Sequence, residues 1–335
     1  MEVQVWLCMC LLIHYTLHAS SFHQKLLFSS STSIMEFDVT RRNVTLLVKD
    51  LNSSVQALDY DYENGYVYFP RFLLNDIMRF QYPSKNITLQ RVIYTQPYPV
   101  GIAIDSPNGH IYWIVDGVNK LSRCNLDGTS VTALTTLRSP WVIRLDVTNR
   151  LIYFTEWLVA ISKIKFDLTE NQMIVNLSIP STCMDLDLDE GRLYWINYDS
   201  DIKSAKFDGS DVQTISSKNL RKGYYGISVL DNNIYYINET ELLMIHKRQG
   251  SSPIVLYNDT KVIDGLFLFK KSGLLINFCV NRNLLVVHTV NVVYFKLSLW
   301  FSQRHQSVGH QESVHAWFST MTTVSEIFQE DKWWQ

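Results

Sequence analysis

Residues 186–197 read LDLDEGRLYWIN, and this stretch contains the pattern that decides the fold. Asp187 precedes a turn of polar residues, and seven positions later Tyr194 begins an aromatic β-type run. Tyrosines in comparable runs recur at intervals of 44, 41, 41 and 41 residues, at Tyr68, Tyr112, Tyr153, Tyr194 and Tyr235. A fixed period near 40 residues with an aromatic strand in each unit is typical of a β-propeller array.

Each repeat unit contains four strand-like runs. An aspartate stands seven positions before the tyrosine in four units, as Asp61, Asp105, Asp146 and Asp187, whereas the fifth has Ser228 there and a shorter turn. Gly and Asn follow these aspartates, and both favour turns because they tolerate positive φ. In the second unit an apolar run (101–104), the aromatic run, a third run (120–124) and a fourth (131–134) are joined by turns that include Asp127-Gly128. Four antiparallel strands per unit make a propeller blade.

The strand count predicts how the ring closes. Five complete units start near Val55, Val100, Trp141, Thr182 and Tyr225, and a sixth innermost strand is expected at 263–269. The segments 26–29, 34–39 and 44–48 form three strands that lack a first one. We therefore predict an all-β, six-bladed propeller over residues 22–280, with four-stranded antiparallel blades and a sixth blade built from both termini.

The two ends of the chain differ from the repeats. Residues 1–20 are predicted to be a secretory signal peptide, because residues 3–17 are mostly apolar and are followed by small residues typical of a cleavage site. An apolar N-terminal strand is the alternative, since no Lys or Arg precedes the apolar run. Residues 281–335 are expected to be a diverged or truncated tail with little fixed structure. Its apolar stretch, 284–301, is interrupted by three polar residues, whereas a membrane-spanning helix needs about 20 mostly apolar ones.

Cysteine and asparagine positions bear on the compartment. Cleavage of the signal would leave Cys124, Cys183 and Cys279, an odd number, so at least one lacks a partner within the chain. Asn-Xaa-Ser/Thr sequons favour a secreted or extracellular location, and we expect glycosylation at Asn43, Asn52, Asn86, Asn176 and Asn258. A sixth sequon, at Asn238, lies beside a strand and is expected to be unmodified. The net charge of −2 and the absence of a basic cluster argue against nucleic-acid binding.

The recurring Leu-Asp, aromatic-pair and Asp-Gly elements, from about Leu26 to Asn283, resemble the low-density lipoprotein receptor class B (YWTD) repeats. These propellers occur in lipoprotein receptors and related Wnt co-receptors, in epidermal growth factor precursor and in nidogen. The family's fourth motif residue, an Asp that helps tie blades together, is replaced here by Arg71, Val115, Glu156, Asn197 and Asn238. Residues 277–283 look like the start of the epidermal-growth-factor-like module that follows such propellers, and the resemblance ends there.

The resemblance implies that one face of the ring binds an extracellular protein ligand. Two sets of residues are expected to surround the mouth of the central channel on that face. The first set precedes the innermost strands and comprises Gln56, Val100, Trp141, Thr182 and Tyr225. The second follows the four-residue motif and comprises Phe72, Asp116, Trp157, Tyr198 and Glu239. Exposed aromatic residues are favoured at binding hot spots.

The implied function is that of a cell-surface receptor module for signalling or endocytosis, with a Wnt-type, Wnt-antagonist or lipoprotein-type ligand. A secreted matrix propeller of nidogen type is the alternative. A calcium-dependent propeller hydrolase is a third possibility, but the regular recurrence of the four aspartates suggests a role in building the blades. Motifs of metalloproteases, serine hydrolases and phosphate-binding loops are absent from the sequence, so we expect no enzyme activity, metal or cofactor.

Overall fold

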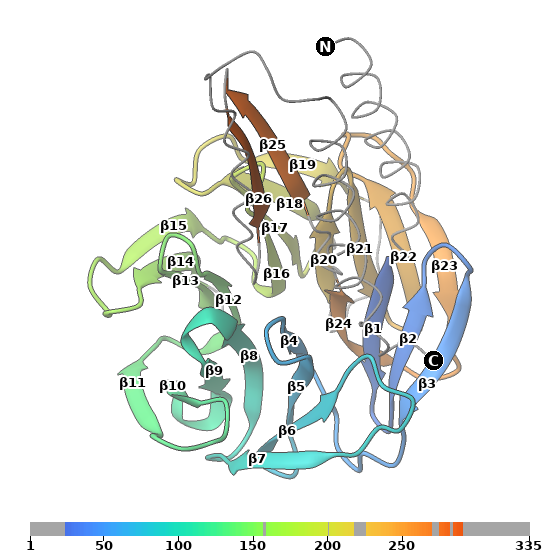
Figure 1. The fold of residues 1–335 in the computed structure, drawn as a ribbon, viewed down its shortest axis with the longest axis vertical. Coiled ribbons are helices and arrows are strands. Elements are labelled where there is room, and N and C mark those ends of the chain that lie inside the picture. The colour runs from blue at the N-terminus through green and yellow to red at the C-terminus, as the bar shows by residue number, and fades with distance from the viewer. Residues whose placement is uncertain are drawn as a thin grey trace, which may run out of the picture. The chain divides into compact units, whose positions relative to one another are not determined.

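The computed structural model describes residues 24–156, 159–199, 201–217, 226–269, 275–281 and 284–290. The chain divides into two compact units, Met1–Gly273 and Leu274–Gln335. The first unit contains six four-stranded antiparallel sheets arranged as blades in a ring (Figure 1). The predicted six-bladed all-β propeller is therefore confirmed.

One strand of each blade lies nearest the centre of the ring. These inner strands, from blade one to blade six, are β24 (Ile263–Phe269), β4 (Asp59–Asp61), β8 (Pro99–Asp105), β12 (Pro140–Asp146), β16 (Ser181–Asp187) and β20 (Ile227–Leu230). The second strands carry the aromatic runs and are β1 (Lys25–Ser30), β5 (Tyr66–Arg71), β9 (His110–Val115), β13 (Leu151–Glu156), β17 (Arg192–Asn197) and β21 (Asn233–Asn238).

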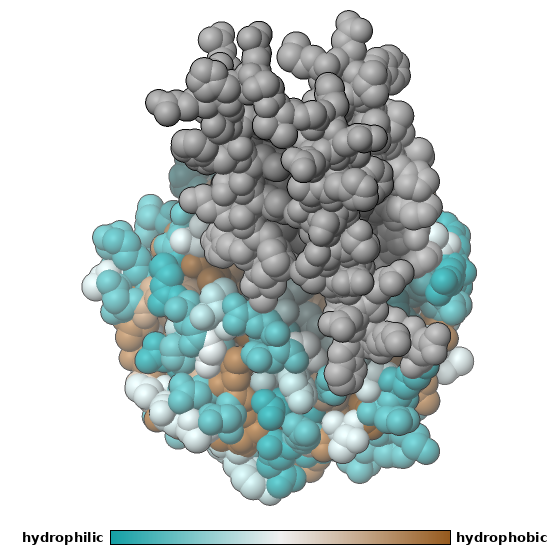
Figure 2. All heavy atoms as spheres, viewed as in Figure 1, coloured by the Kyte–Doolittle hydropathy of each residue, from teal (hydrophilic) through white to brown (hydrophobic). Residues whose placement is uncertain are grey.

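The remaining strands complete each sheet towards its outer edge. The third strands are β2 (Ile34–Asp38), β6 (Asp76–Gln81), β10 (Lys120–Asn125), β14 (Ala160–Lys165), β18 (Ile202–Lys206) and β22 (Glu241–His246). The outermost strands are β3 (Asn43–Val48), β7 (Gln90–Tyr94), β11 (Thr132–Thr136), β15 (Gln172–Asn176), β19 (Gln213–Ser216) and β23 (Ile254–Asn258). In Figure 2, hydrophilic side chains cover much of the visible described surface, with hydrophobic ones between them.

Blade one is built from both ends of the first unit, as predicted. The inner strand β24 pairs antiparallel with β1, and the sheet order is β24-β1-β2-β3. The register places Phe28 opposite Leu266 and Leu26 opposite Leu268, and all four side chains are buried. Pairing of distant segments closes the ring and covers the edge that β24 would otherwise expose.

The five periodic tyrosines form the walls between blades. Each is almost completely buried. The Tyr112 ring, for example, lies 5.3 Å from that of Phe166 and packs with Ile152, both of which belong to the next blade. Burying large aromatic rings between the blades supplies much of the apolar contact that holds the ring together.

The four recurring aspartates hold turns and connect blades. Asp146 accepts hydrogen bonds from the Asn149 backbone N–H (2.9 Å) and the Asn149 side chain (2.7 Å), which fixes the turn between β12 and β13. Arg150 of blade four donates to Asp105 of blade three (3.1 Å), and Lys247 of blade six pairs with Asp187 of blade five. These contacts give the aspartates a structural role.

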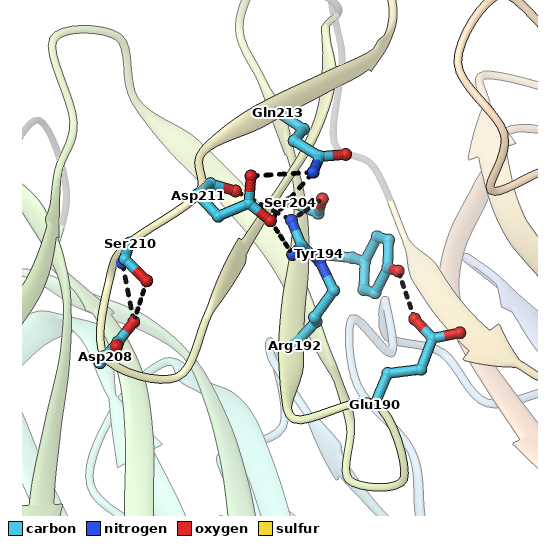
Figure 3. Close-up of polar contacts among 8 residues, drawn as sticks. All are labelled: Glu190, Arg192, Tyr194, Ser204, Asp208, Ser210, Asp211 and Gln213. Carbon is cyan, nitrogen blue, oxygen red and sulfur yellow. Dashed lines mark hydrogen bonds and ion pairs between the residues drawn. The ribbon is translucent and has the colours of Figure 1, made fainter.

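Polar contacts also fasten the strands of blade five to each other (Figure 3). Arg192 of β17 bonds to Asp211 (2.6 Å) and to Ser204 of β18 (2.9 Å). The Asp208 carboxylate accepts from the backbone N–H and hydroxyl of Ser210, closing the turn that leads to β19.

Strand register corrects the expected place of Ser228. Ser228 lies opposite Tyr235, whereas Asp185 lies opposite Tyr194. Ser228 is therefore the counterpart of Asp185 and not of Asp187. Counting seven residues back from the tyrosine was wrong in this blade because the shorter β20–β21 hairpin turns at Asp231 and Asn232.

Cys124 and Cys183 are buried and form no disulfide among the described residues, and burial raises the pKa of each thiol to about 12. In the second unit, β25 (Leu275–Asn281) and β26 (Leu284–Val290) form an antiparallel hairpin. The strand β26 falls within residues 281–335, which are expected to be a diverged or truncated tail, and the β-branched residues of Leu284–Val290 favour a strand. In the part of the chain that is described, no helix is long and apolar enough to cross a membrane. The predicted signal peptide lies outside the described residues.

Candidate functional site

The described members of the two predicted sets lie at one end of the ring. Since the strands are antiparallel, the loop after each second strand lies beside the start of an inner strand. Backbone hydrogen bonds fix this neighbourhood: Phe72 N–H donates to Ser54 (3.1 Å), and Asp116 N–H donates to Tyr98 (3.0 Å). In blade five, Tyr198 N–H donates likewise to Pro180 (2.9 Å). In blade six, the carbonyl of Glu239 accepts from Ile263 N–H (2.8 Å), at the start of blade one's inner strand.

The inner strands surround a small axial cavity. Its volume is about 30 Å³, enough for about one or two water molecules. Gln56, Val100 and Trp141 line this cavity together, with glycines 101 and 226 and Cys183 among the other lining residues. Three residues of the first predicted set therefore share one location at the axis.

Some of the other predicted site residues are described by the structure and some are not. Trp157 and Tyr225 lie outside the described residues, and so does the side chain of Thr182, whose backbone belongs to β16. Phe72, Asp116, Tyr198 and Glu239 are half-buried. Burial raises the pKa of the Asp116 carboxyl above its usual value.

Val100 is buried at the place where a ligand-binding residue is predicted. Its side chain is 2% exposed and packs in the core cluster between blades three and four. Val100 therefore contributes to the core between the blades as well as to the lining of the axial cavity. Trp141 is half-buried and packs against core clusters on both sides of blade four, so part of its surface serves the fold.

Asp264 is the sixth member of the first set, and the sequence reasoning missed it. The bulge in the β24–β1 ladder skips Asp264, as the bulge in the β8–β9 ladder skips Val100, and Gly265 is the counterpart of Gly101. Burial raises the pKa of Asp264 to about 6, and its Oδ2 is buried without a hydrogen-bond partner among the described residues, as is Oε1 of Gln56. The Xaa-Gly pairs at 100–101, 225–226 and 264–265 were the signal that could have located it.

A second feature missed from the sequence is an apolar cluster at the rim of the mouth, on blades two and three. We call it the rim patch and define it as Phe72, Leu73, Leu74, Tyr98 and Val118. Leu73 is 61%, Leu74 40% and Tyr98 45% exposed. The Phe72 and Tyr98 rings lie 4.9 Å apart. The run Phe-Leu-Leu in a loop was the available signal, because loop tips are ordinarily polar.

The loop that carries most of the rim patch is held rigidly at its base. Arg71 forms a two-pronged ion pair with the buried Asp76 across the β5–β6 hairpin, at 2.8 and 2.6 Å. Arg91 of β7 adds a third bond to Asp76, at 2.9 Å. The Tyr98 N–H donates to the Asn75 side chain at 3.0 Å, which connects this loop to blade three. Arg71 thus supplies a contact at the motif position where the family has Asp.

Polar residues of the inner strands connect the blades near the axis. Arg144 of blade four bonds to Asp185 of blade five at 3.1 Å, and Asp185 accepts from the Val229 N–H of blade six at 2.8 Å. Asp59 of blade two accepts from the Ile104 N–H of blade three at 2.7 Å. Burial raises the pKa of Asp59 to about 6, although its two backbone hydrogen bonds and Arg144 oppose that rise.

Comparison with known proteins agrees with this geometry. The chain is 28% identical over 262 residues to human low-density lipoprotein receptor-related protein 5. This alignment covers 69% of the chain and 15% of that relative. Its fold matches a crystal structure of a nidogen/laminin complex with a TM-score of 0.65 and 15% identity, over 74% of this chain and 99% of the matched chain. No family model matches the chain.

The chain is a six-bladed β-propeller that is similar to the low-density lipoprotein receptor class B (YWTD) repeat propellers. The nidogen-complex match shows the fold, and the alignment to the human receptor-related protein agrees with the repeat pattern. The chain spans only 15% of the length of that relative, so the alignment concerns one propeller-sized part of it.

Proposed function

We propose that this propeller is the extracellular protein-binding module of a lipoprotein-receptor-related cell-surface receptor. The location proposed is the secreted or extracellular side of the plasma membrane. The similarity to a receptor-related protein supports the receptor class, and the sequons and the apolar N-terminal stretch support the location.

The observation that carries the proposal is the rim patch. Its exposed leucines and Tyr98 form an apolar surface on a loop held by the Arg71–Asp76 ion pair. Contiguous exposed apolar residues on a soluble protein mark interaction sites, and a preformed surface loses little entropy when it binds. Asp116 and Asp264, at the nearby mouth, would add orientation to the apolar contact.

The ligand classes proposed are a Wnt-type protein, a Wnt antagonist or a lipoprotein-type particle, for signalling or for endocytosis. A matrix role of nidogen type receives less support, because the likeness to the nidogen/laminin complex is at 15% identity and concerns the fold. Laminin is therefore included among the test ligands as the probe of that alternative.

The experiment measures binding of a Wnt protein, a secreted Wnt antagonist, a low-density lipoprotein particle and laminin to the immobilised propeller. A Leu73→Ser/Leu74→Ser variant is compared with Leu188→Ser, whose side chain is 51% exposed on the β16–β17 turn at the opposite end of the ring. Removing two leucines from a buried contact should weaken binding at least about tenfold, since each is worth about 1.5–3 kcal/mol when fully buried. Equal affinities of the two variants for a ligand that binds would contradict the face assignment.

A further inference from the structure

Each blade ends in a strand with an open edge. Within the described residues, the sheet orders terminate at β3, β7, β11, β15, β19 and β23, so each of these strands has a hydrogen-bonded neighbour on one side only. Unpaired N–H and C=O groups on such an edge can pair with another chain, and proteins counter this with charges, prolines or covering groups.

Three of these outermost strands contain a glycosylation sequon at a terminal residue. Asn43 is the first residue of β3, Asn176 the last of β15 and Asn258 the last of β23. All three asparagines are exposed. The same three strands also carry exposed aliphatic side chains, each about half accessible: Leu46, Met173, Ile254 and Val255.

The three strands without a sequon are protected in other ways. The exposed positions of β11 are Thr132, Ala133 and Thr136, and none of the β19 side chains is fully exposed. The strand β7 exposes Arg91, whose guanidinium lies 4.2 Å from the centre of the Tyr94 ring and covers part of it. Sequons therefore coincide with the edges that combine open backbone and exposed aliphatic side chains.

We propose that N-linked glycans on Asn43, Asn176 and Asn258 shield the open edges of blades one, four and six. In each transfer, the side-chain Nδ2 bonds to the anomeric carbon of a lipid-diphosphate-linked oligosaccharide, the bond from that carbon to the diphosphate breaks, and the amide loses one proton. A bulky polar glycan at the end of the strand prevents a second strand from aligning along it. Asn238 is excluded because it is half-buried in β21 and its Nδ2 donates to Glu241 at 3.3 Å.

The first test maps glycan occupancy on the chain secreted from animal cells, by mass spectrometry of peptides after glycosidase treatment. Occupied Asn43, Asn176 and Asn258 with an unmodified Asn238 are expected. An unmodified asparagine on any one of the three edges would overturn the proposal for that blade.

The second test removes the glycans from the purified, folded protein and follows its size by chromatography with light scattering. The monomer peak should be lost over time. The matched control is an Asn52→Gln/Asn86→Gln variant that keeps its edge glycans, since Asn52 and Asn86 are exposed loop residues, and it should stay monomeric.

A third variant separates edge shielding from a general effect of glycans on solubility. Leu46→Lys, Met173→Lys and Val255→Lys together place a charge on each apolar edge, and this variant should remain monomeric after the glycans are removed. Aggregation of the lysine variant, or a stable monomer of the deglycosylated wild type, would contradict the proposal.

Discussion

Gly209 offers a sharp test of how neighbouring blades fit together. It lies in the β18–β19 turn of blade five at φ +84°, against the bulged residue Ile174 of β15 in blade four. A Cβ added at Gly209 would overlap the carbonyl oxygen of Ile174 and lie 3.0 Å from its carbonyl carbon. Both atoms are backbone, so Gly209→Ala requires blades four and five to move apart.

The magnitude follows from two contributions. A positive φ costs a non-glycine residue about 1–2 kcal/mol, and forcing extra volume into a packed site costs about 1–3 kcal/mol more. The matched control is Gly191→Ala, because Gly191 has φ +64° and its added Cβ would meet no atom within 4 Å. Urea denaturation should therefore show a free energy of unfolding about 2–5 kcal/mol lower for Gly209→Ala and about 1–2 kcal/mol lower for the control. Equal losses would refute the argument that the blades meet closely at this turn.

Three other predictions concern closure and charge. Deleting residues 24–50 removes β1, β2 and β3 and exposes the edge of β24, so the thermal unfolding midpoint should fall sharply; an unchanged midpoint would rule out the shared blade. Lys247→Met removes the cation that pairs with the Asp187 carboxylate. Burial opposes the ionised form of Asp187, but Lys247 and the turn N–H groups lower its pKa, so the free energy of unfolding measured with urea should fall by about 3 kcal/mol. A titration followed by carbon-13 NMR should give the Asp59 carboxyl a pKa near 6. This pKa is higher than the value of about 3.9 in the unfolded chain. The contribution of Asp59 to the free energy of unfolding is therefore full below pH about 4 and is lost as the pH rises through 6. A titration midpoint near 4 would contradict the burial of Asp59.

Much of the fold was predictable because each blade repeats the same pattern of buried tyrosines and aspartate turns. Six blades were predicted from the tyrosine period and the aspartate turns, and the shared blade from the complementary strand sets at the two ends. The structure confirms the six blades and the shared blade. Counting seven residues back from each tyrosine failed at Ser228, where the hairpin is shorter. A fixed offset in the sequence does not determine which residues pair across two strands.

The candidate site was less predictable, since it depends on where side chains point and on irregular backbone. Val100 was assigned to the mouth from its place in the repeat, but neighbouring blades bury its side chain. Asp264 needed the bulge beside Ser29 to bring it to the mouth. The rim patch is formed by loops of two blades, and its exposure follows from their packing and not from a motif.

Hydrogen exchange on a complex tests the proposed binding face most directly. With a ligand that binds, amide protection should increase at residues 72–75, at Tyr98 and at residues 116–119, which form or adjoin the rim patch. Residues 188–191, on the turn at the opposite end of the ring, should exchange at the same rate with and without ligand. Protection confined to that turn, with no change at the rim patch, would contradict the account.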